Sequence, residues 1–191
     1  MYKDQIIEIG IVFLSGYSEI RTEHRYFNPT VEINPAAKKV HGLSKEFLSK
    51  YAIFDPEWLI LIIKSYPLII HNANFDFNFI NCELKRFNYP ILTNQIIDTL
   101  QIARTKFPGA PANLDALCSR FKIENKHRKL HGALVDALLT AKVYSKLFNY
   151  GAKALSFGEI KTNSIMSNNI QVNVSDKEKI AYLEHLRKIH S

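Results

Sequence analysis

Residues 71–76 (HNANFD) hold the first group of side chains whose types and spacing suit chemistry. Asp76 follows a short apolar run and falls in the first turn of an expected helix. A carboxylate at that position can complement the positive end of the helix, or it can serve as a hard oxygen ligand for Mg²⁺ or Mn²⁺. The spacing alone leaves both interpretations of Asp76 open.

Residues 131–136 (HGALVD) form the second group. Gly132 allows His131 to lie in the loop that approaches a helix, while Asp136 projects from the first turns of that helix. A neutral His has a pKa of about 6.5, so beside a metal-bound water it is a suitable general base. A His followed five residues later by an Asp does not by itself establish such a site.

Two other polar positions lie at expected element boundaries. His41 and Gly42 follow two lysines, so this stretch is equally a loop that contacts phosphate or an ordinary turn. Asp98 precedes an expected helix at Thr99, which favours a helix cap or an orienting group over a metal ligand.

The elements that must position these residues alternate between strands and helices, which predicts a mixed α/β domain with its helices packed on a sheet. Residues 5–14 and 19–27 are predicted to form an antiparallel hairpin. Short strands are expected at residues 68–70 and 96–97. Helices are expected after the cap Ser44, over 57–66 after Pro56, from residue 74 onward, after the second short strand as far as residue 102, around 114–121, and over 134–148.

Composition divides the chain into one domain and a tail. We expect the domain over residues 1–151, a polar linker over 152–174, and a short helical tail over 175–191. Ser175 followed by Glu178 predicts a capping box at the start of that tail.

The overall composition is that of an ordinary globular protein, with 47% hydrophobic and 23% charged residues among 191. Its 25 Lys and Arg exceed 18 Asp and Glu, and the net charge of +7 makes nucleic acid a plausible partner. The apolar run 58–63 is far shorter than the roughly 18–20 residues of a membrane span, and no secretory signal is expected. We therefore expect a cytoplasmic protein, with Cys82 and Cys118 as free thiols.

Six segments, taken in order along residues 5–150, closely resemble the epsilon (proofreading) subunit family of bacterial DNA polymerase III. These segments are 40–43 (VHGL), 71–76 (HNANFD), 98–100 (DTL), 107–109 (FPG), 113–118 (NLDALC) and 130–137 (LHGALVDA). The resemblance implies a ribonuclease-H-like 3′–5′ exonuclease fold of the DEDDh group, with a mixed sheet flanked by helices.

The resemblance also implies roles for individual residues. Asp76 and Asp136 match metal-binding residues of a site for two Mg²⁺ or Mn²⁺ ions, and His131 matches the general base. The residues that match the pocket for the terminal nucleotide are Val40, His41, His71, Asn72 and Phe75. Residues 175–191 resemble the segment that tethers some members to the polymerase catalytic (alpha) subunit.

One departure from the family concerns its first motif, Asp-x-Glu-Thr-Thr-Gly, which precedes the segment matching residues 6–10. No Asp-x-Glu pair stands ahead of Ile6. We therefore expect the first, central strand to be missing, and we expect the incomplete carboxylate set to bind metal weakly and to hydrolyse DNA very poorly.

The leading functional hypothesis is a metal-dependent proofreading exonuclease that removes mispaired 3′-terminal nucleotides from DNA within a replicative polymerase. The second hypothesis is a catalytically impaired or inactive protein that binds the polymerase core. A free-standing exoribonuclease of the same superfamily is the third. Binding of residues 175–191 to a polymerase catalytic subunit would argue against the third hypothesis.

Overall fold

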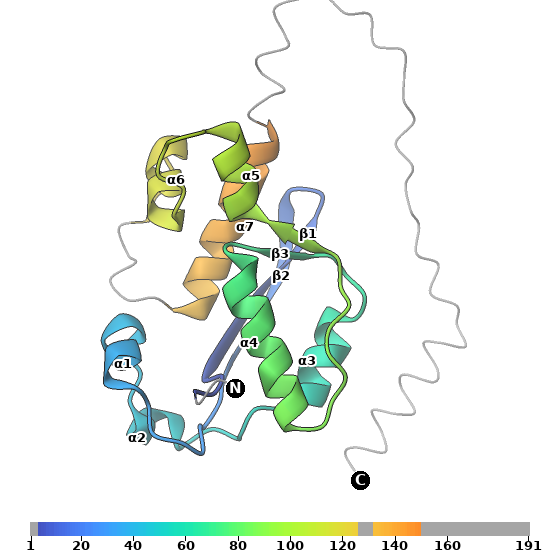
Figure 1. The fold of residues 1–191 in the computed structure, drawn as a ribbon, viewed down its shortest axis with the longest axis vertical. Coiled ribbons are helices and arrows are strands. Elements are labelled where there is room, and N and C mark those ends of the chain that lie inside the picture. Colours follow the sequence, from blue (N-terminus) through green and yellow to red (C-terminus); the bar gives the residue numbers. More distant parts are fainter. Residues whose placement is uncertain (1–3, 126–131, 150–191) are drawn as a thin grey trace, which may run out of the picture. The chain divides into compact units, whose positions relative to one another are not determined.

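A computed structural model of the protein describes residues 4–125 and 132–149 (Figure 1). His131 and the predicted linker and tail lie outside these residues. The elements in chain order are β1 (Glu8–Ser15), β2 (Ser18–Tyr26), α1 (Pro35–His41), α2 (Lys45–Leu48), α3 (Pro56–Ile63), β3 (Leu68–Ile70), α4 (Ala73–Arg86), β4 (Ile96–Asp98), α5 (Thr99–Lys106), α6 (Leu114–Phe121) and α7 (Ala133–Asn149). Within this described part, no helix combines the length and the apolar character needed to cross a membrane.

Strands β1 and β2 form the predicted antiparallel hairpin, in which Glu8 pairs with Tyr26 and Gly10 pairs with His24. The turn passes through Gly16, whose φ of +61° residues with a side chain adopt only rarely. A shift in register follows Phe13. The hairpin is longer than any other strand pair described in the structure.

The predicted short strands also form, and they pair with each other. Strand β3 runs parallel to β4, with Ile69 opposite Ile97. Over the described residues the four strands make two two-stranded sheets, one antiparallel and one parallel, rather than one continuous sheet. The structure thus combines α-helices with strands of both relative directions, as the sequence predicts.

Two helices differ from the sequence expectation. Helix α1 is absent from the helices expected from the sequence, because Asn and Pro at adjacent positions also commonly end regular structure. In fact the Asn34 side chain caps the helix and Pro35 occupies its first turn. Helix α3 ends at Ile63, three residues before the expected Tyr66, because Lys64 adopts a positive φ of 43°.

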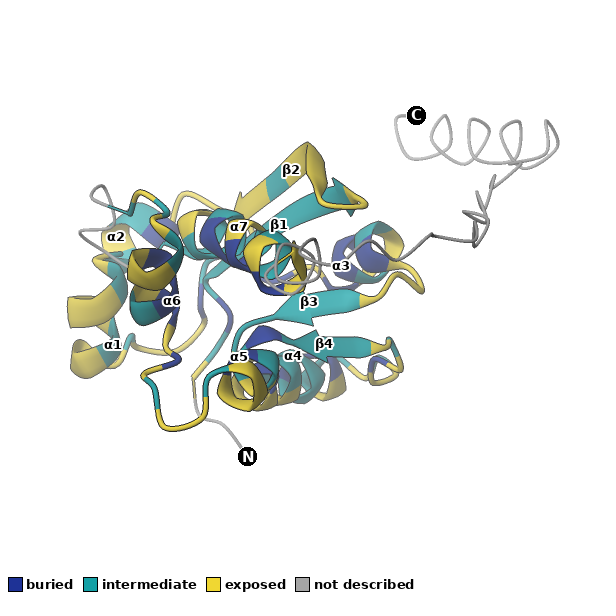
Figure 2. Cartoon of the chain, turned by 90° about the horizontal axis from the view of Figure 1, so that it is seen from above, coloured by how far each residue is buried: buried dark blue, intermediate teal, exposed yellow. Residues whose placement is uncertain are grey.

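Among the residues that the structure describes, two apolar clusters form the core. Figure 2 shows buried residues along the helices next to exposed ones. The first cluster joins the start of the chain, α3 and α4, and includes Phe27, Trp58 and Leu84. The second joins α5, α6 and α7, and includes Leu117 and Val143. Helix α4, which carries Asp76, therefore packs in the first cluster, and helix α7, which carries Asp136, packs in the second.

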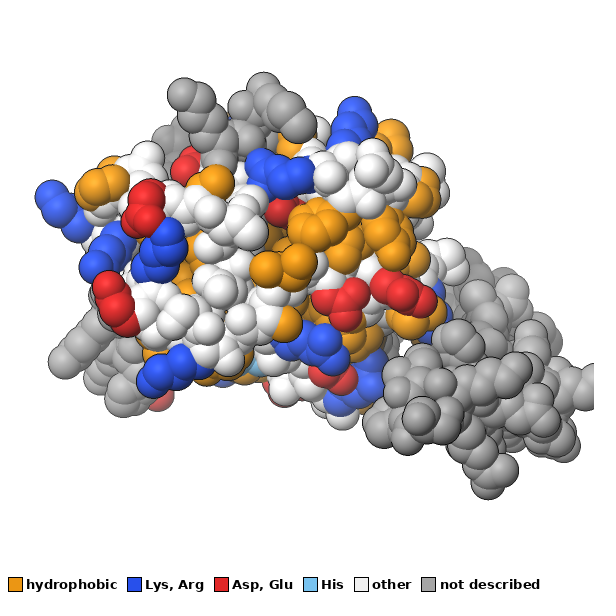
Figure 3. Space-filling model, turned by 90° about the horizontal axis from the view of Figure 1, so that it is seen from below, with side chains coloured by type: hydrophobic (Ala, Val, Ile, Leu, Met, Phe, Trp, Pro, Cys, Tyr) orange, Lys and Arg blue, Asp and Glu red, His pale blue; other side chains and the backbone are white. Residues whose placement is uncertain are grey.

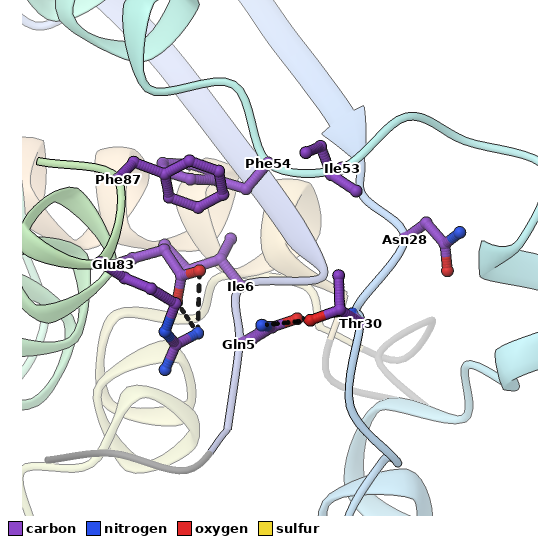
Figure 4. A pocket seen from close by; sticks show the side chains of 9 residues that line it. Gln5, Ile6, Asn28, Thr30, Ile53, Phe54, Glu83 and Phe87 are labelled. Carbon is purple, nitrogen blue, oxygen red and sulfur yellow. Dashed lines mark hydrogen bonds and ion pairs between the residues drawn. The ribbon is translucent and has the colours of Figure 1, made fainter.

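A clamp fixes the segment before β1 to the far end of α4 (Figure 4). Arg86 pairs with the buried carboxylate of Glu83 at 2.9 Å and donates to the Asp4 carbonyl oxygen at 3.2 Å. Gln5 exchanges hydrogen bonds with Thr30. Because its polar groups pair with one another around a cavity of only about 170 Å³, we regard this clamp as structural.

Candidate active site

The loop between β3 and α4 places Asp76 in the first turn of α4. Asn72 starts this turn with a φ of +70°, in the left-handed region that Asn tolerates better than most residues. Its carbonyl oxygen accepts the Phe75 amide at 3.0 Å. The sharp turn brings the chain from the buried strand directly into the helix that carries Asp76.

Asp98 connects this turn to the next helix. One of its carboxylate oxygens accepts the backbone N–H groups of Leu100 at 2.8 Å and Asn72 at 3.2 Å. The other accepts the N–H of Ala73 at 3.0 Å. Asp98 thus caps α5, which confirms the predicted cap, and it also holds the start of α4.

His71 is held by a buried hydroxyl. The Thr99 hydroxyl donates to the Ile70 carbonyl oxygen at 3.3 Å and lies 2.9 Å from Nδ1 of His71. The His71 ring is therefore fixed at the end of β3, next to the turn that precedes Asp76.

Helix α7 brings Asp136 to the site by packing closely on β1. A Cβ atom on Gly10 would lie 2.3 Å from the backbone nitrogen of Leu134 and 2.4 Å from its Cα. Only glycine allows the strand and the helix to approach this closely. Asp136 follows in the first turn of α7, where its N–H donates to the Gly132 carbonyl oxygen at 3.0 Å.

The two aspartates lie within electrostatic reach of each other. Burial by the surrounding protein, the negative charge of Asp136 and that of Asp98 together raise the pKa of Asp76 from 3.8 to about 6. By surface area Asp76 is nevertheless exposed, so water and ions can reach it even though nearby protein disfavours its charged form. Helices α4 and α7 therefore converge on a pair of like charges.

This pair fits a divalent cation, because a positive ion would offset the repulsion that raises the pKa of Asp76. Mg²⁺ and Mn²⁺ take oxygen ligands of this kind. Among residues 4–125 and 132–149, no group of three or more His, Cys, Asp or Glu side chains has the geometry to hold a metal ion. The two aspartates are thus the metal-ligand candidates that the described part brings together.

The remaining predicted site residues divide between two elements. Phe75 lies beside Asp76 in the first turn of α4, and the residue is 57% exposed. Val40 and His41 end α1, where Val40 is 51% exposed. The His41 Nδ1 accepts the Leu43 amide at 3.0 Å, so its neutral ring carries the proton on Nε2, a buried atom with no partner in the described structure.

A buried acid on β1 was not singled out from the sequence. The Glu8 side chain is 8% exposed and accepts a hydrogen bond from His24 at 2.8 Å. A lone charged residue within the apolar run 5–14 was the available signal. Its partner is 16 residues away, so local spacing could not identify the pair.

Positive charge is not concentrated on the face of the molecule that Figure 3 shows. Figure 3 shows the Lys and Arg side chains of one face spread around it rather than gathered in one patch. Two arginines of the described residues pack on aromatic rings, Arg25 over Trp58 at 4.3 Å and Arg120 over Phe107 at 4.5 Å. The net charge therefore indicates no single binding surface on this face.

Solved structures share this fold. The structure of Exonuclease X in complex with 5′ overhanging duplex DNA matches with a TM-score of 0.62 and 22% identity, over 77% of this chain and 84% of that chain. The nuclease domain of 3′hExo, a DEDDh family member bound to rAMP, matches with a TM-score of 0.65 and 16% identity, over 77% and 82%. At these identities the likeness shows the fold alone.

Sequence comparisons show the family. The family model RNase_T, described as Exonuclease, matches residues 1–144. A DNA polymerase III subunit epsilon from Rickettsia felis is 40% identical over 175 residues, covering 87% of this chain and 76% of that protein. One from Rickettsia typhi is 43% identical over 186 residues, covering 92% and 79%. The chain therefore belongs to the exonuclease family, among the epsilon subunits of DNA polymerase III.

Proposed function

We propose that this protein is the proofreading 3′–5′ exonuclease of a bacterial replicative polymerase, and that it removes mispaired 3′-terminal nucleotides from DNA. The observation that carries the proposal is the convergence of Asp76 and Asp136 in a chain of the exonuclease family. Two like charges on separate helices disfavour the metal-free site, and a divalent ion would relieve that repulsion.

Asp76 and Asp136 would hold Mg²⁺ or Mn²⁺. When bound, the ion supplies Lewis-acid activation of the attacking water and stabilises the charge that develops on the phosphate. His131, which directly precedes Gly132, would take the proton of that water as general base. The Asp98 carboxylate keeps the α4 turn fixed, so that Asp76 is presented in one position.

The residues before and within the first turn of α4 would receive the terminal nucleotide. Phe75 offers an exposed ring on which a base can stack, and His71 and Asn72 line the adjoining turn. Val40 and His41 would complete this pocket from the end of α1. Selectivity would follow from fraying, because a mispaired end unstacks at a lower free-energy cost and reaches the pocket more often.

We propose the polymerase catalytic (alpha) subunit as the protein partner, bound through residues 175–191, with both proteins in the cytoplasm. The names of the relatives as polymerase subunits support such a partner. A pull-down of the alpha subunit by the full chain, and its loss when residues 175–191 are deleted, would test the assignment of the tail.

The nuclease proposal is tested with a 5′-labelled primer that carries either a paired or a mispaired 3′ end. With Mn²⁺ or Mg²⁺, the full chain should shorten the mispaired primer at least several-fold faster than the paired one. Asp76→Asn should abolish shortening. Glu57→Gln, at an exposed position in the first turn of α3, is the matched control and should retain the wild-type rate.

A second candidate is a protein that binds the polymerase core without nuclease activity. It is favoured by one observation, that the described residues bring only two metal-ligand carboxylates together rather than three or more. Binding of the labelled primer without shortening, at saturating Mn²⁺, would support this candidate against the exonuclease. Faster shortening of an RNA strand than of DNA would instead support a free-standing exoribonuclease.

A further inference from the structure

Glu8 is a buried acidic residue that does not belong to the pair formed by Asp76 and Asp136. It begins β1, its side chain is 8% exposed, and its Oε1 lies 2.8 Å from Nε2 of His24 on the neighbouring strand. Gly10 pairs with His24 in the hairpin register, so the Glu8 side chain reaches diagonally across the two strands. A buried carboxylate is retained at low cost only when it is hydrogen-bonded in this way.

The groups around Glu8 come from three other elements. His24 and Tyr26 face it from β2, and the charge of Glu8 acts on the His41 ring at the end of α1. On the side of α7, a Cβ atom on Gly132 would lie 3.7 Å from Oε1 of Glu8. The carboxylate therefore lies where the hairpin, α1 and the start of α7 meet.

Glu8 and Gly10 share one face of β1, because side chains alternate along a strand. Both lie beside the beginning of α7: a Cβ atom added to Gly132 would come within 3.7 Å of Glu8 Oε1, and one added to Gly10 would lie 2.3 Å from the Leu134 nitrogen. A negative charge near the first turn of a helix is also favourable, since the N–H groups there point outward. Strand β1 thus fixes the beginning of α7 by a close backbone contact and by an adjacent carboxylate.

We propose that Glu8, held by His24, is a positioning residue that sets the start of α7 and thereby the placement of Asp136 opposite Asp76. The proposal rests on the proposed nuclease function for its kinetic consequence. Glu8 does not touch the reacting atoms in this scheme. It acts through the first turn of α7, in which Asp136 donates its N–H to the Gly132 carbonyl oxygen.

The first experiment measures steady-state cleavage of the mispaired primer by the full-length protein with Mn²⁺. Glu8→Gln keeps the side-chain size and one acceptor oxygen but removes the charge. We expect kcat to fall at least tenfold while KM stays within twofold of wild type. His24→Gln should lower kcat in the same way, and the double variant should lose no more than either single variant, because the two residues act as one unit.

The matched control is Glu23→Gln. Glu23 lies on the same strand as His24 but one residue away, so it faces the opposite side of the hairpin, where it pairs with Arg21 at 3.7 Å. It should retain wild-type kcat and KM. An unchanged kcat in Glu8→Gln, additive losses in the double variant, or losses that disappear on lowering the temperature would each overturn the positioning role.

A second measurement does not require nuclease activity. Amide hydrogen exchange of the metal-free protein should show at least tenfold faster exchange at the Asp136 amide in Glu8→Gln, with the amides of α6 unchanged. If the wild type cuts no DNA but this local change appears, the nuclease proposal fails and the positioning role stands. Unchanged exchange at Asp136 would overturn the positioning role regardless of activity.

Discussion

At the scale of single residues, the site is defined by a carboxylate placed where its charge is disfavoured. Asp76 lies among protein atoms and close to Asp136 and Asp98, and these neighbours raise its pKa to about 6. Metal-binding and catalytic sites characteristically perturb their acids in this manner. The consequence is measurable without any substrate, because protonation of Asp76 and binding of a cation are alternative ways to relieve the same repulsion.

The pKa of Asp76 predicts how stability depends on pH. Since its value in the folded protein exceeds the usual 3.8, the folded state binds this proton more tightly than the unfolded state does. The contribution of Asp76 to the free energy of unfolding therefore decreases as pH rises from about 4 to about 6. Asp76→Asn in EDTA should unfold at a higher temperature than wild type at pH 7.5, with a smaller difference at pH 4.5.

The exposed surface substitution Glu57→Gln is again the matched control, and its melting temperature should follow that of wild type at both values of pH. A melting temperature for Asp76→Asn that lies below wild type at pH 7.5 would show that the native carboxylate is stabilised rather than strained. Circular dichroism at a helix band is sufficient for this comparison.

Asp98 makes a different prediction, because it accepts three backbone N–H groups with its two oxygens. Asp98→Ala leaves these donors without their partner and should lower the free energy of unfolding by about 2–3 kcal/mol. Asp98→Asn keeps one acceptor oxygen and should lose less. Urea denaturation measures both, and equal losses in the two variants would contradict the capping role.

At the scale of elements, the sequence predicted most helices and strands, and its errors have local causes. Asn34 and Pro35 form a helix start, but the same two residue types also end patterns, so α1 was missed. Lys64 ends α3 with a positive φ of 43°, without the glycine that would have signalled it. Asp76 and Asp136 could be singled out as candidates from the sequence because each lies in the first turn of a periodic helix. Glu8 and His24 were missed because only the pairing of two strands brings them together.

The contact between β1 and α7 is the element-level feature that positions Asp136. Gly10→Ala would place a methyl group 2.3 Å from the Leu134 nitrogen, so the helix must move away from the strand. Overpacking of this kind should lower the free energy of unfolding by about 2–3 kcal/mol and should also reduce cleavage. Urea denaturation of the variant measures the first effect, and the primer assay measures the second.

Gly132→Ala provides a matched control for the free energy of unfolding, since its added methyl group would find its nearest neighbour at 3.7 Å, an ordinary contact distance. It should change the free energy of unfolding by much less than Gly10→Ala. Equal destabilisation by the two substitutions would mean that the close approach at Gly10 has no special energetic role.

At the scale of the whole described domain, the two apolar clusters belong to different sets of helices. The first contains residues of α3 and α4, and the second contains residues of α5, α6 and α7. Asp76 belongs to α4 and Asp136 to α7. A cation bound by both aspartates would therefore connect the parts of the molecule that carry the two clusters, in addition to the contacts that β1, Asp98 and Thr99 already provide.

This arrangement predicts that metal binding stabilises the domain as a whole. Mn²⁺ at about 100 times its dissociation constant should add about 2.7 kcal/mol to the free energy of unfolding, which corresponds to a rise of roughly 5–10 °C in melting temperature. Asp76→Asn and Asp136→Asn should each remove most of that rise, while Glu57→Gln should retain it. Hydrogen exchange should show added protection in both α4 and α7, because the ion would be bound by one residue of each. Protection confined to α4 would mean that Asp76 binds the ion without Asp136, and the shared site would then be wrong.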